Sequence, residues 1–322
     1  MAQAGDRNFA LIGAAGYIAP RHMQAIHATG HRLVAALDPS DSVGIIDRYF
    51  PDSAFFTEFE RFDRHIDKLR RAGNRDKVDY VSICSPNYLH DSHIRFALRS
   101  DADAICEKPL VLNPWNIDGL VEAESASGRK VSTVLQLRVH PAIANLRERV
   151  RCEDGRKHDV DLTYITARGR WYAYSWKGDE KKSGGIATNI GVHFFDMLHY
   201  IFGALKDSKV HVAEPERAAG WLEYEHARVR WFLSVDAADL PAAANASGQR
   251  TFRSITVDGE EIEFSGGFAD LHDRSYELIL AGQGFGLEDS RCAIETVAAI
   301  RTAAALGAVG DCHPLAARGT AR

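Results

Sequence analysis

The segment that most constrains the fold lies near the start of the chain, where a buried-strand pattern runs into a glycine turn. Residues 9–12 are a short apolar run, followed by Gly13-Ala-Ala-Gly-Tyr-Ile-Ala19 and a helical pattern through Ile26. Glycines at such a turn let the backbone approach a pyrophosphate, and the N-terminus of the next helix receives its charge. The spacing is G-x-x-G-x-x-A rather than G-x-G-x-x-G, so a plain tight turn is the alternative to a dinucleotide site.

An acidic residue follows the next predicted strand. Residues 33–37 are apolar and end at Asp38, about twenty residues beyond the glycine turn, where a carboxylate can hydrogen-bond an adenosine ribose. A carboxylate there repels a 2′-phosphate, so the sequence favours NAD over NADP. The competing interpretation is an N-cap or an Asx-turn before Pro39.

The first half of the chain alternates between strand and helix patterns. Predicted strands cover residues 9–12, 33–37, 55–56, 79–84, 103–110 and 130–137, and predicted helices cover 43–49, 58–71, 114–126 and a segment ending near Leu98. This alternation predicts an α/β fold in which residues 1–140 form a doubly wound parallel Rossmann sheet.

Polar residues follow the fourth predicted strand. The run is Ser85-Pro86-Asn87-Tyr-Leu-His90. Because ligands of open α/β sheets bind beyond the carboxyl ends of the strands, we expect Asn87 and His90 to hold the ribose or amide of a cofactor. For His90, a histidine facing solvent at the start of a helix is the alternative.

The fifth predicted strand ends in Glu107-Lys108-Pro109. Proline disfavours the helical conformation in the residue before it, so Lys108 should stay extended and project its amine into the cleft above the sheet. Taken alone, the pair favours the alternative of a surface Glu-Lys contact, and the neighbouring motifs reverse that preference.

The pattern changes after a predicted helix at residues 139–152. Period-two alternation marks strands near 160–164, 227–235, 251–257 and 261–264, with an Asp258-Gly259 turn. We therefore predict a second α/β domain over residues 141–322, with a mostly antiparallel open sheet and C-terminal helices, near 270–281 and 288–306, that pack back on the body.

Residues 183–200 carry a second polar constellation. If a helix begins near Gly185, then Asn189, His193 and Asp196 share one face. A third strong metal ligand is missing, so no metal is expected. A core or capping histidine and a general base aimed at a substrate hydroxyl remain the alternatives for His193.

The loop before that helix is both cationic and aromatic. It reads Arg168-Gly-Arg-Trp-Tyr172 and continues through Lys177 to Asp179. Arginine and lysine can clamp a carboxylate or diphosphate while aromatic rings stack on a base or sugar. An interdomain or subunit contact that buries the aromatic rings is the alternative.

Composition excludes several classes of protein. The net charge of -5 over 322 residues carries no basic stripe, which argues against nucleic acid as a partner. Five cysteines without a C-x-x-C pair indicate neither a disulfide framework nor a zinc site and fit a reducing cytoplasm. We expect no membrane segment, because no apolar run approaches the roughly 20 residues that a membrane span needs.

Together these motifs resemble the Gfo/Idh/MocA family of NAD(P)-dependent sugar oxidoreductases. The resemblance spans nearly the whole chain and rests on residues 13–19, Asp38, Ser85-Pro-Asn87-x-x-His90, Glu107-Lys108-Pro109 and Gly191-x-His193-x-x-Asp196. Residues 13–22, 134–138, 168–172 and 175–179 are more narrowly similar to the UDP-N-acetylglucosaminuronate 3-dehydrogenases of bacterial surface polysaccharide synthesis. That likeness implies oxidation of the sugar C3 hydroxyl with NAD, reoxidation of the cofactor by 2-oxoglutarate in some members, and a homotetramer in many.

The motifs and the resemblance together give a set of expected site residues. Catalytic roles fall to Lys108, His193 and Asn189, with Lys108 and His193 interchangeable as base and oxyanion partner. Expected cofactor contacts are Gly13, Gly16, Tyr17, Ile18, Asp38, Ser85, Pro86, Asn87, His90, Glu107, Lys108 and Gln136. Expected substrate contacts are Lys108, Arg168, Tyr172, Lys177, Thr188, Asn189 and His193. A free sugar or inositol dehydrogenase and a non-catalytic NAD-binding regulator are the alternatives.

Overall fold

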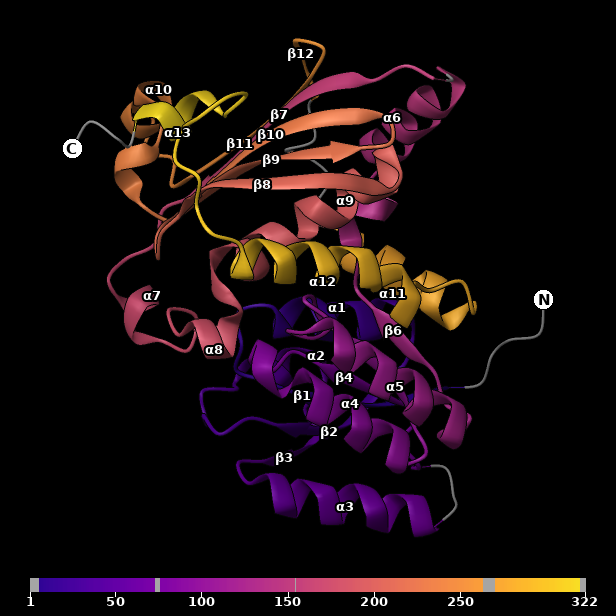
Figure 1. Ribbon diagram of the computed structural model, residues 1–322. Helices are drawn as coiled ribbons and strands as arrows, with labels where there is room; N and C mark the ends of the chain where they lie inside the picture. Colours follow the sequence, from indigo (N-terminus) through magenta and orange to yellow (C-terminus); the bar gives the residue numbers. More distant parts are fainter. Residues whose placement is uncertain (1–5, 73–75, 154, 263–269, 319–322) are drawn as a thin grey trace. The chain divides into compact units, whose positions relative to one another are not determined.

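The chain divides into two compact units in the computed structural model, which describes residues 6–72, 76–153, 155–262 and 270–318 (Figure 1). Unit 1 comprises Met1–Gln136 and Ala269–Arg291, and unit 2 comprises Leu137–Phe268 and Cys292–Arg322. The functional division into residues 1–140 and 141–322 stays a prediction. The contacts between residues nevertheless assign Ala269–Arg291, from the C-terminal half of the chain, to unit 1.

Unit 1 is built on a sheet of six parallel strands in the order β3-β2-β1-β4-β5-β6. The strands are β1 (Asn8–Ile12), β2 (Arg32–Leu37), β3 (Ala54–Phe56), β4 (Tyr80–Ile83), β5 (Asp103–Cys106) and β6 (Val131–Thr133). This arrangement confirms the predicted doubly wound Rossmann sheet. The strand order reverses between β1 and β4, and ligands of such sheets bind at that point, beyond the carboxyl ends of the strands.

The helices of unit 1 begin and end largely where the sequence indicates. They are α1 (Ala19–Ala28), α2 (Ile45–Tyr49), α3 (Phe59–Ala72), α4 (His90–Arg99), α5 (Pro114–Ser127) and α11 (Leu271–Leu280), with a 3₁₀ turn at Asn87–Leu89. In α5, proline occupies the first turn, and Gly128 ends the helix with a φ of 66°. Proline at the start and a left-handed glycine at the end are the usual helix boundaries.

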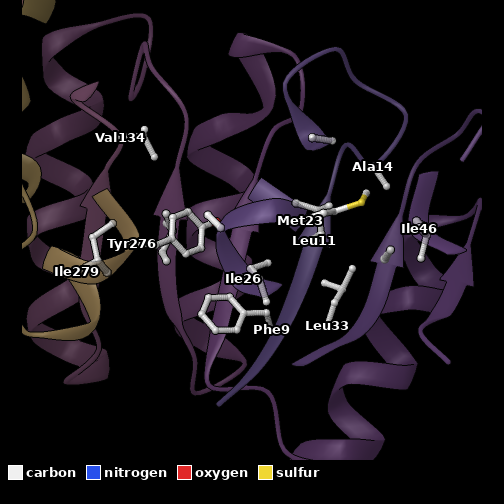
Figure 2. Close-up of a cluster of buried hydrophobic side chains, with 14 residues drawn as sticks. Phe9, Leu11, Ala14, Met23, Ile26, Leu33, Ile46, Val134, Tyr276 and Ile279 are labelled. Carbon is white, nitrogen blue, oxygen red and sulfur yellow. The ribbon is translucent and has the colours of Figure 1, made fainter. Parts of the chain in front are cut away.

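The core of unit 1 includes side chains from α11. Phe9 and Leu11 of β1 pack with Met23 and Ile26 of α1, and Tyr276 of α11 joins the same cluster (Figure 2). The rings of Phe9 and Tyr276 stack with centroids 5.9 Å apart. Burial of each such large apolar side chain stabilises the fold by about 1.5–3 kcal/mol, so α11 is an integral part of unit 1.

Unit 2 contains a second six-stranded sheet in the order β12-β11-β7-β10-β9-β8. The strands are β7 (His158–Thr166), β8 (Leu205–Ala213), β9 (Arg217–Tyr224), β10 (Ala227–Ser234), β11 (Thr251–Val257) and β12 (Glu260–Glu261). Only the β7–β10 pair is parallel among the pairings of the described strands, which confirms the mostly antiparallel sheet. The predicted strand at 261–264 extends beyond the described residues.

The sequence did not indicate β8 and β9. In β9 the run Ala-Ala-Gly breaks the alternation expected of a strand. The structure explains the glycine, because a Cβ on Gly220 would lie 2.3 Å from the Lys209 carbonyl oxygen and 2.7 Å from the Trp231 ring. The residues on the two neighbouring strands leave no room for a side chain at this position, so β9 carries a glycine where an alternating strand pattern would have another residue.

The helices of unit 2 include the predicted one near Gly185, with a difference at its start. They are α6 (Pro141–Cys152), α7 (Trp171–Tyr174), α8 (Glu180–Ser183), α9 (Val192–Phe202), α10 (Ala242–Ala246) and α13 (Pro314–Arg318), and α12 (Leu287–Thr302) runs from unit 1 into unit 2. A π-helix, Ala187–Gly191, precedes α9. Among the described residues, we find no helix with the length and apolar character that crossing a membrane requires.

Two buried histidines should make the stability of the protein depend on pH. Desolvation by burial lowers the pKa of His93 to about 4, aided by the charges of His90 and Arg99, and burial also lowers the pKa of His313 to about 4. The unfolded chain binds these protons near pH 6.5, so the stabilisation is complete above pH 6.5 and is lost as pH falls toward 4. Each histidine should cost roughly 2–3 kcal/mol by pH 4.5.

Thermal unfolding of His93→Gln between pH 7.5 and 4.5 tests this dependence. Glutamine does not titrate, so the variant should lose less stability than the wild type as pH falls, and the exposed-site control His27→Gln should follow the wild type. Equal losses in all three proteins would contradict the prediction.

Candidate functional site

The glycine turn lies directly after β1 and against the loop that follows β4. Gly13 has a φ of 91°, and its N–H donates to the Leu37 carbonyl at 2.8 Å. A Cβ at Gly13 would lie 2.6–2.7 Å from the backbone of Cys84 and Ser85. Two separate constraints therefore require glycine at position 13: the positive φ of its backbone and the closeness of the Cys84 and Ser85 backbone.

The carboxylate of Asp38 joins the glycine turn to the end of β2. One oxygen accepts the N–H of Ala15 at 2.9 Å, and the other accepts the N–H of Ser40 at 2.9 Å. The Asx-turn alternative is therefore present in the structure, and the other oxygen joins Asp38 to the glycine turn. The contact of Asp38 with an adenosine ribose stays a prediction. Glycine turn, helix start and acidic strand end together fit the pyrophosphate and adenosine ribose of NAD.

Asp38 gives a prediction for cofactor preference. Replacement by serine removes the charge that repels a 2′-phosphate, so the ratio of NAD to NADP affinity should fall by about 10-fold or more. Titration of both cofactors by protein fluorescence measures the ratio. The exposed neighbour Asp41→Ser is the control and should keep the wild-type preference. An unchanged ratio in Asp38→Ser would argue against a ribose contact.

His90 links the loop after β4 to the turn after β5. Its side chain is 1% exposed, with Nδ1 2.7 Å from the Pro109 carbonyl oxygen and Nε2 2.9 Å from that of Ser85. The alternative of a solvent-facing histidine is therefore wrong. Burial lowers the pKa of His90, and a neutral ring has one N–H, which serves one of these two carbonyls at a time. Ser85 also hydrogen-bonds His93, at 2.8 Å.

The residues after β5 combine a buried carboxylate with a partly exposed lysine. Glu107 is 7% exposed, so a surface Glu-Lys pair is not what the structure contains. Lys108 is partly exposed, and the peptide bond between Lys108 and Pro109 is cis. The backbone N–H of Lys108 donates to Oε2 of Glu107 at 3.3 Å. Because β4 and β5 are parallel neighbours, Lys108 and the Ser85–His90 loop lie at the same edge of the sheet.

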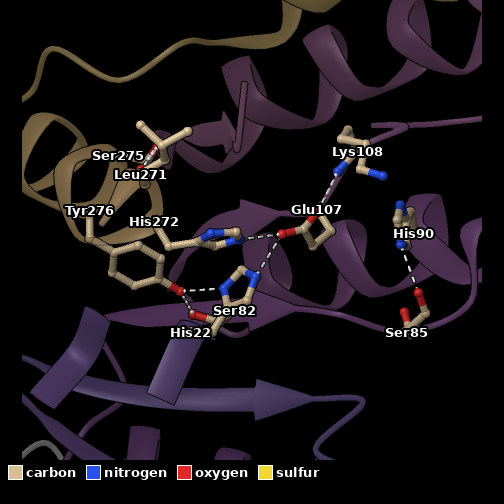
Figure 3. Close-up of polar contacts among 10 residues, drawn as sticks. All are labelled: His22, Ser82, Ser85, His90, Glu107, Lys108, Leu271, His272, Ser275 and Tyr276. Carbon is tan, nitrogen blue, oxygen red and sulfur yellow. Dashed lines mark hydrogen bonds and ion pairs between the residues drawn. The ribbon is translucent and has the colours of Figure 1, made fainter. Parts of the chain in front are cut away.

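Four residues around Glu107 were not identified from the sequence. Oε1 of Glu107 lies 2.9 Å from Nε2 of both His22 and His272 (Figure 3). The Tyr276 hydroxyl contacts Nδ1 of His22 at 2.7 Å and Oγ of Ser82 at 2.6 Å. Burial raises the pKa of Glu107, but the hydrogen bonds and charges of the two imidazoles outweigh it and hold that pKa well below its usual value. Glu107, His22, His272, Tyr276 and Ser82 thus form a buried polar network, and Glu107 links it to the backbone N–H of Lys108.

In unit 2 the cationic and aromatic loop contacts the residues before α9. The amide Nδ2 of Asn189 donates to the Tyr172 hydroxyl at 2.8 Å. The Lys177 ammonium lies 5.3 Å from the centroid of the Trp171 ring and 5.6 Å from that of Trp176. Burial, and then the charge of Arg168, lower the pKa of Lys177. The structure thus brings together Tyr172 and Asn189, and places Arg168 within electrostatic reach of Lys177.

The predicted Asn-His-Asp face is divided in the structure. Asp196 is 2% exposed and forms a bidentate pair with Arg138, at 3.0 Å and 2.6 Å. His193 is partly exposed, and Asn189 lies in the π-helix, so α-helical spacing does not relate all three. π-Helical turns occur frequently at functional sites. Asp196 therefore supports the fold of this segment through Arg138.

The remaining predicted contacts lie at several positions. Gly16 donates its N–H to the Gly13 carbonyl at 3.0 Å, Tyr17 is 95% exposed, and Asn87 is 6% exposed. Ile18 and Pro86 adjoin these residues, and Gln136 opens the 3₁₀ turn Gln136–Val139 after β6. Thr188 is fully buried, and its hydroxyl has no hydrogen-bond partner among the described residues. Their contacts with cofactor or substrate stay predictions.

Comparison with family models decides the family. Residues 7–134 match the model described as the oxidoreductase family, NAD-binding Rossmann fold, of Gfo/Idh/MocA proteins. Residues 156–261 match the C-terminal alpha/beta domain of the same family. The chain belongs to the Gfo/Idh/MocA family of oxidoreductases. The resemblance stated from the sequence is therefore confirmed, as is NAD as the cofactor of the Rossmann unit.

Similar proteins within the Gfo/Idh/MocA family include a solved structure that spans nearly the whole chain. The WlbA (WbpB) dehydrogenase from Thermus thermophilus, in complex with NAD and alpha-ketoglutarate, is 53% identical, with a TM-score of 0.92 over 96% of this chain and 99% of that one. The same enzyme with NAD and UDP-GlcNAcA gives 52% identity and a TM-score of 0.91 over the same shares of the two chains, 96% and 99%.

Curated relatives are more distant. The putative UDP-kanosamine synthase oxidoreductase subunit of Amycolatopsis mediterranei (strain S699) is 28% identical over 67% of this chain. The putative oxidoreductase YteT of Bacillus subtilis (strain 168) is 26% identical over 55% of this chain. The matched regions span 58% and 41% of the lengths of these two relatives.

Proposed function

We propose that this protein oxidises the C3 hydroxyl of UDP-N-acetyl-2-amino-2-deoxy-D-glucuronate to a ketone with NAD, and that 2-oxoglutarate reoxidises the cofactor. The observation that carries the proposal is the 53% identity, over 96% of the chain, to a dehydrogenase solved with NAD and alpha-ketoglutarate and also solved with NAD and UDP-GlcNAcA. Likeness at this level supports a shared substrate class as well as a shared fold.

The chemistry of unit 2 supports an anionic sugar nucleotide. Lys177 supplies positive charge beside the Trp171 and Trp176 rings, and Arg168 lies within electrostatic reach of Lys177. A diphosphate and a carboxylate need such charges, and a uracil or sugar ring can stack on the aromatic faces. A neutral free sugar or inositol has no group that would use Arg168 and Lys177, which disfavours that alternative.

In the proposed mechanism two side chains act on one hydroxyl of the substrate. When bound, NAD supplies the acceptor for the C3 hydride. His193 takes the hydroxyl proton as general base, because histidine is the side chain best suited to accept and release a proton near neutral pH. Lys108 holds the same oxygen and stabilises the developing negative charge. The alternative assignment exchanges these roles, with Lys108 as the base and His193 holding the oxygen.

Asn189 and Tyr172 have supporting roles in this proposal. The hydrogen bond of 2.8 Å between them holds the amide of Asn189, and in the proposal this amide orients the sugar. Lys108 belongs to unit 1 and His193 to unit 2, so their meeting at one oxygen is part of the proposal. Thr188 and the cofactor contacts of the glycine turn complete the proposed site.

One incubation tests the proposal. Purified protein receives UDP-N-acetylglucosaminuronate, a catalytic amount of NAD and excess 2-oxoglutarate, and mass spectrometry follows both substrates. The expected result is a sugar nucleotide that has lost two hydrogens and an equal amount of 2-hydroxyglutarate, which balances the hydride and proton removed. UDP-N-acetylglucosamine, which lacks the carboxylate, and myo-inositol are the controls.

Other outcomes would select the alternatives. Turnover of myo-inositol or a free sugar in preference to the uronate would replace the substrate assignment. Binding of NAD without turnover of any of these compounds would favour a non-catalytic regulator. By resemblance, we further propose a cytoplasmic homotetramer that acts in the synthesis of bacterial surface polysaccharide, such as the O-antigen of lipopolysaccharide.

A further inference from the structure

The hydrogen bonds around Glu107 have one consistent direction when His22 is neutral, the state that burial favours by lowering the pKa of His22. An ionised carboxylate only accepts, so Nε2 of His22 and Nε2 of His272 both donate to Oε1 of Glu107. The Nδ1 atom of His22 then accepts the Tyr276 hydroxyl proton, and the Tyr276 oxygen accepts the Ser82 hydroxyl proton. We call Ser82, Tyr276, His22, Glu107 and His272 the Glu107 cluster. Every donor and acceptor in this chain of contacts is used in a compatible sense.

The same residue types are also suited to a metal ion, but their geometry is not. His22, Glu107 and His272 present ligand atoms within 4.8 Å of one another. A tetrahedral zinc ion with bonds of about 2.0–2.1 Å would hold its ligand atoms about 3.3 Å apart. Both imidazoles instead lie 2.9 Å from one carboxylate oxygen, which is a normal hydrogen-bond distance.

The cluster connects four elements of unit 1. His22 lies on α1, which follows the glycine turn, Ser82 lies on β4, and Glu107 directly follows β5. The two other members, His272 and Tyr276, lie on α11, which comes from the distant C-terminal half of the chain. The second oxygen of Glu107 accepts the N–H of Lys108 at 3.3 Å. One carboxylate therefore joins α11 to the backbone N–H of Lys108.

Glu107 is also a buried carboxylate directly next to Lys108 in the chain. The titratable groups facing it are His22 of α1, Cys84 after β4, His90 of α4, Cys106 of β5, and His272 and Tyr276 of α11. Burial raises the pKa of both cysteines and of Tyr276 and lowers the pKa of His22 and His90, so these groups are neutral near pH 7. A buried carboxylate is weakly screened and favours the charged ammonium of its neighbour.

We infer that the Glu107 cluster sets both the position and the charged state of Lys108, and that His272 of α11 is a positioning residue for catalysis. This inference rests on the proposed role of Lys108 in oxidation of the sugar hydroxyl. In this inference Glu107 positions Lys108 without contacting the substrate, and α11 contributes to catalysis as well as to the core of unit 1.

The first test compares three variants on α11. His272→Leu removes the donor and should lower kcat by about 10- to 100-fold, because small displacements of a reacting group carry penalties of this size. The Kd for NAD should change less than about 3-fold. His272→Gln restores an N–H donor that does not titrate and should recover most of kcat. Asp273→Asn is the matched control, because Asp273 connects α11 to Gln24 of α1 without touching Glu107.

The second test reads Lys108 directly and needs no substrate. Wild-type protein, Glu107→Gln and Asp273→Asn are labelled with acetic anhydride across a pH series, and peptide mass analysis gives the extent of Lys108 acetylation. Loss of the neighbouring negative charge should shift the Lys108 labelling curve of Glu107→Gln to lower pH by about one unit or more. The exposed Lys130 reports on the reagent in each sample and should not shift.

The outcomes separate the inference from the proposed function. A wild-type protein inactive on the uronate but with a shifted Lys108 curve in Glu107→Gln would overturn the function and keep the inference about the charge. An unshifted curve would overturn that inference, and so would unchanged kcat in His272→Leu. If His272→Leu does not fold, His272→Gln and Glu107→Gln still decide. One equivalent of zinc in the wild type, lost in His272→Gln, would replace the cluster by a metal site.

Discussion

Replacing Lys108 by alanine should lower kcat for oxidation of the uronate by about 10³-fold while NAD still binds. The proposed ammonium holds the oxygen on which charge develops, and groups of this kind contribute roughly 10²- to 10³-fold or more. Lys108 is partly exposed and lies outside the apolar core, so its loss should leave thermal stability nearly unchanged. Formation of reduced cofactor, measured by absorbance in single-turnover and steady-state experiments, gives kcat, and fluorescence titration gives the Kd for NAD.

The matched control for this variant is Lys130→Ala. Lys130 lies in the same unit, its side chain is 77% exposed, and its contact with Glu124 is long, at 3.8 Å. Exposed ion pairs of this kind contribute about 0–1 kcal/mol, so the control should keep wild-type kcat and stability. Full activity in Lys108→Ala would remove Lys108 from the mechanism.

Replacing Gly13 by alanine should abolish measurable NAD binding and lower the melting temperature. The added Cβ would lie 2.6 Å from the carbonyl carbon of Cys84 and 2.7 Å from the nitrogen of Ser85, both backbone atoms that cannot rotate away. A φ of 91° adds a penalty of about 1–2 kcal/mol for any residue with a Cβ. The turn must therefore move, and with it the backbone that is to hold the pyrophosphate. Calorimetric titration with NAD and a thermal melt measure the two effects.

Gly30→Ala separates these two causes. Gly30 has a φ of 78°, but no described atom lies within 4 Å of its Cβ position. This control shares the backbone strain and lacks the collision, so it should lose a few degrees in melting temperature and bind NAD normally. Wild-type NAD affinity in Gly13→Ala would contradict the assignment of this turn to the cofactor.

The parallel sheet was predictable because its signals are local. The apolar run 9–12, the glycine turn and Asp38 each act within a few residues, and the structure joins them through the hydrogen bond from Ala15 to Asp38. Lys108 was predictable for the same reason, since it follows a strand and precedes a proline. The family resemblance added the proposed substrate, which strand patterns alone do not specify.

The Glu107 cluster was not predictable, because its members are far apart in the chain. His22 and His272 are 85 and 165 residues from Glu107, and nothing in the sequence around either histidine marks a partner. β9 was missed for another reason, since its glycine is explained by the Trp231 ring on the neighbouring strand, a contact that the local pattern does not show. The spacing argument for Asp196 had a different weakness, because it assumed an uninterrupted α-helix where a π-helix precedes α9.

The return of Ala269–Arg291 to unit 1 bears on how the protein is made. The N-terminal 136 residues leave the ribosome long before α11 is synthesised. Until then, the apolar residues around Phe9 lack their contact with Tyr276, and Glu107 lacks its hydrogen bond from His272. Domains usually complete their folding in the order of synthesis. Here the first unit is finished only after nearly all of the second has emerged, so a fragment ending near Gln136 should aggregate unless a peptide containing α11 is supplied.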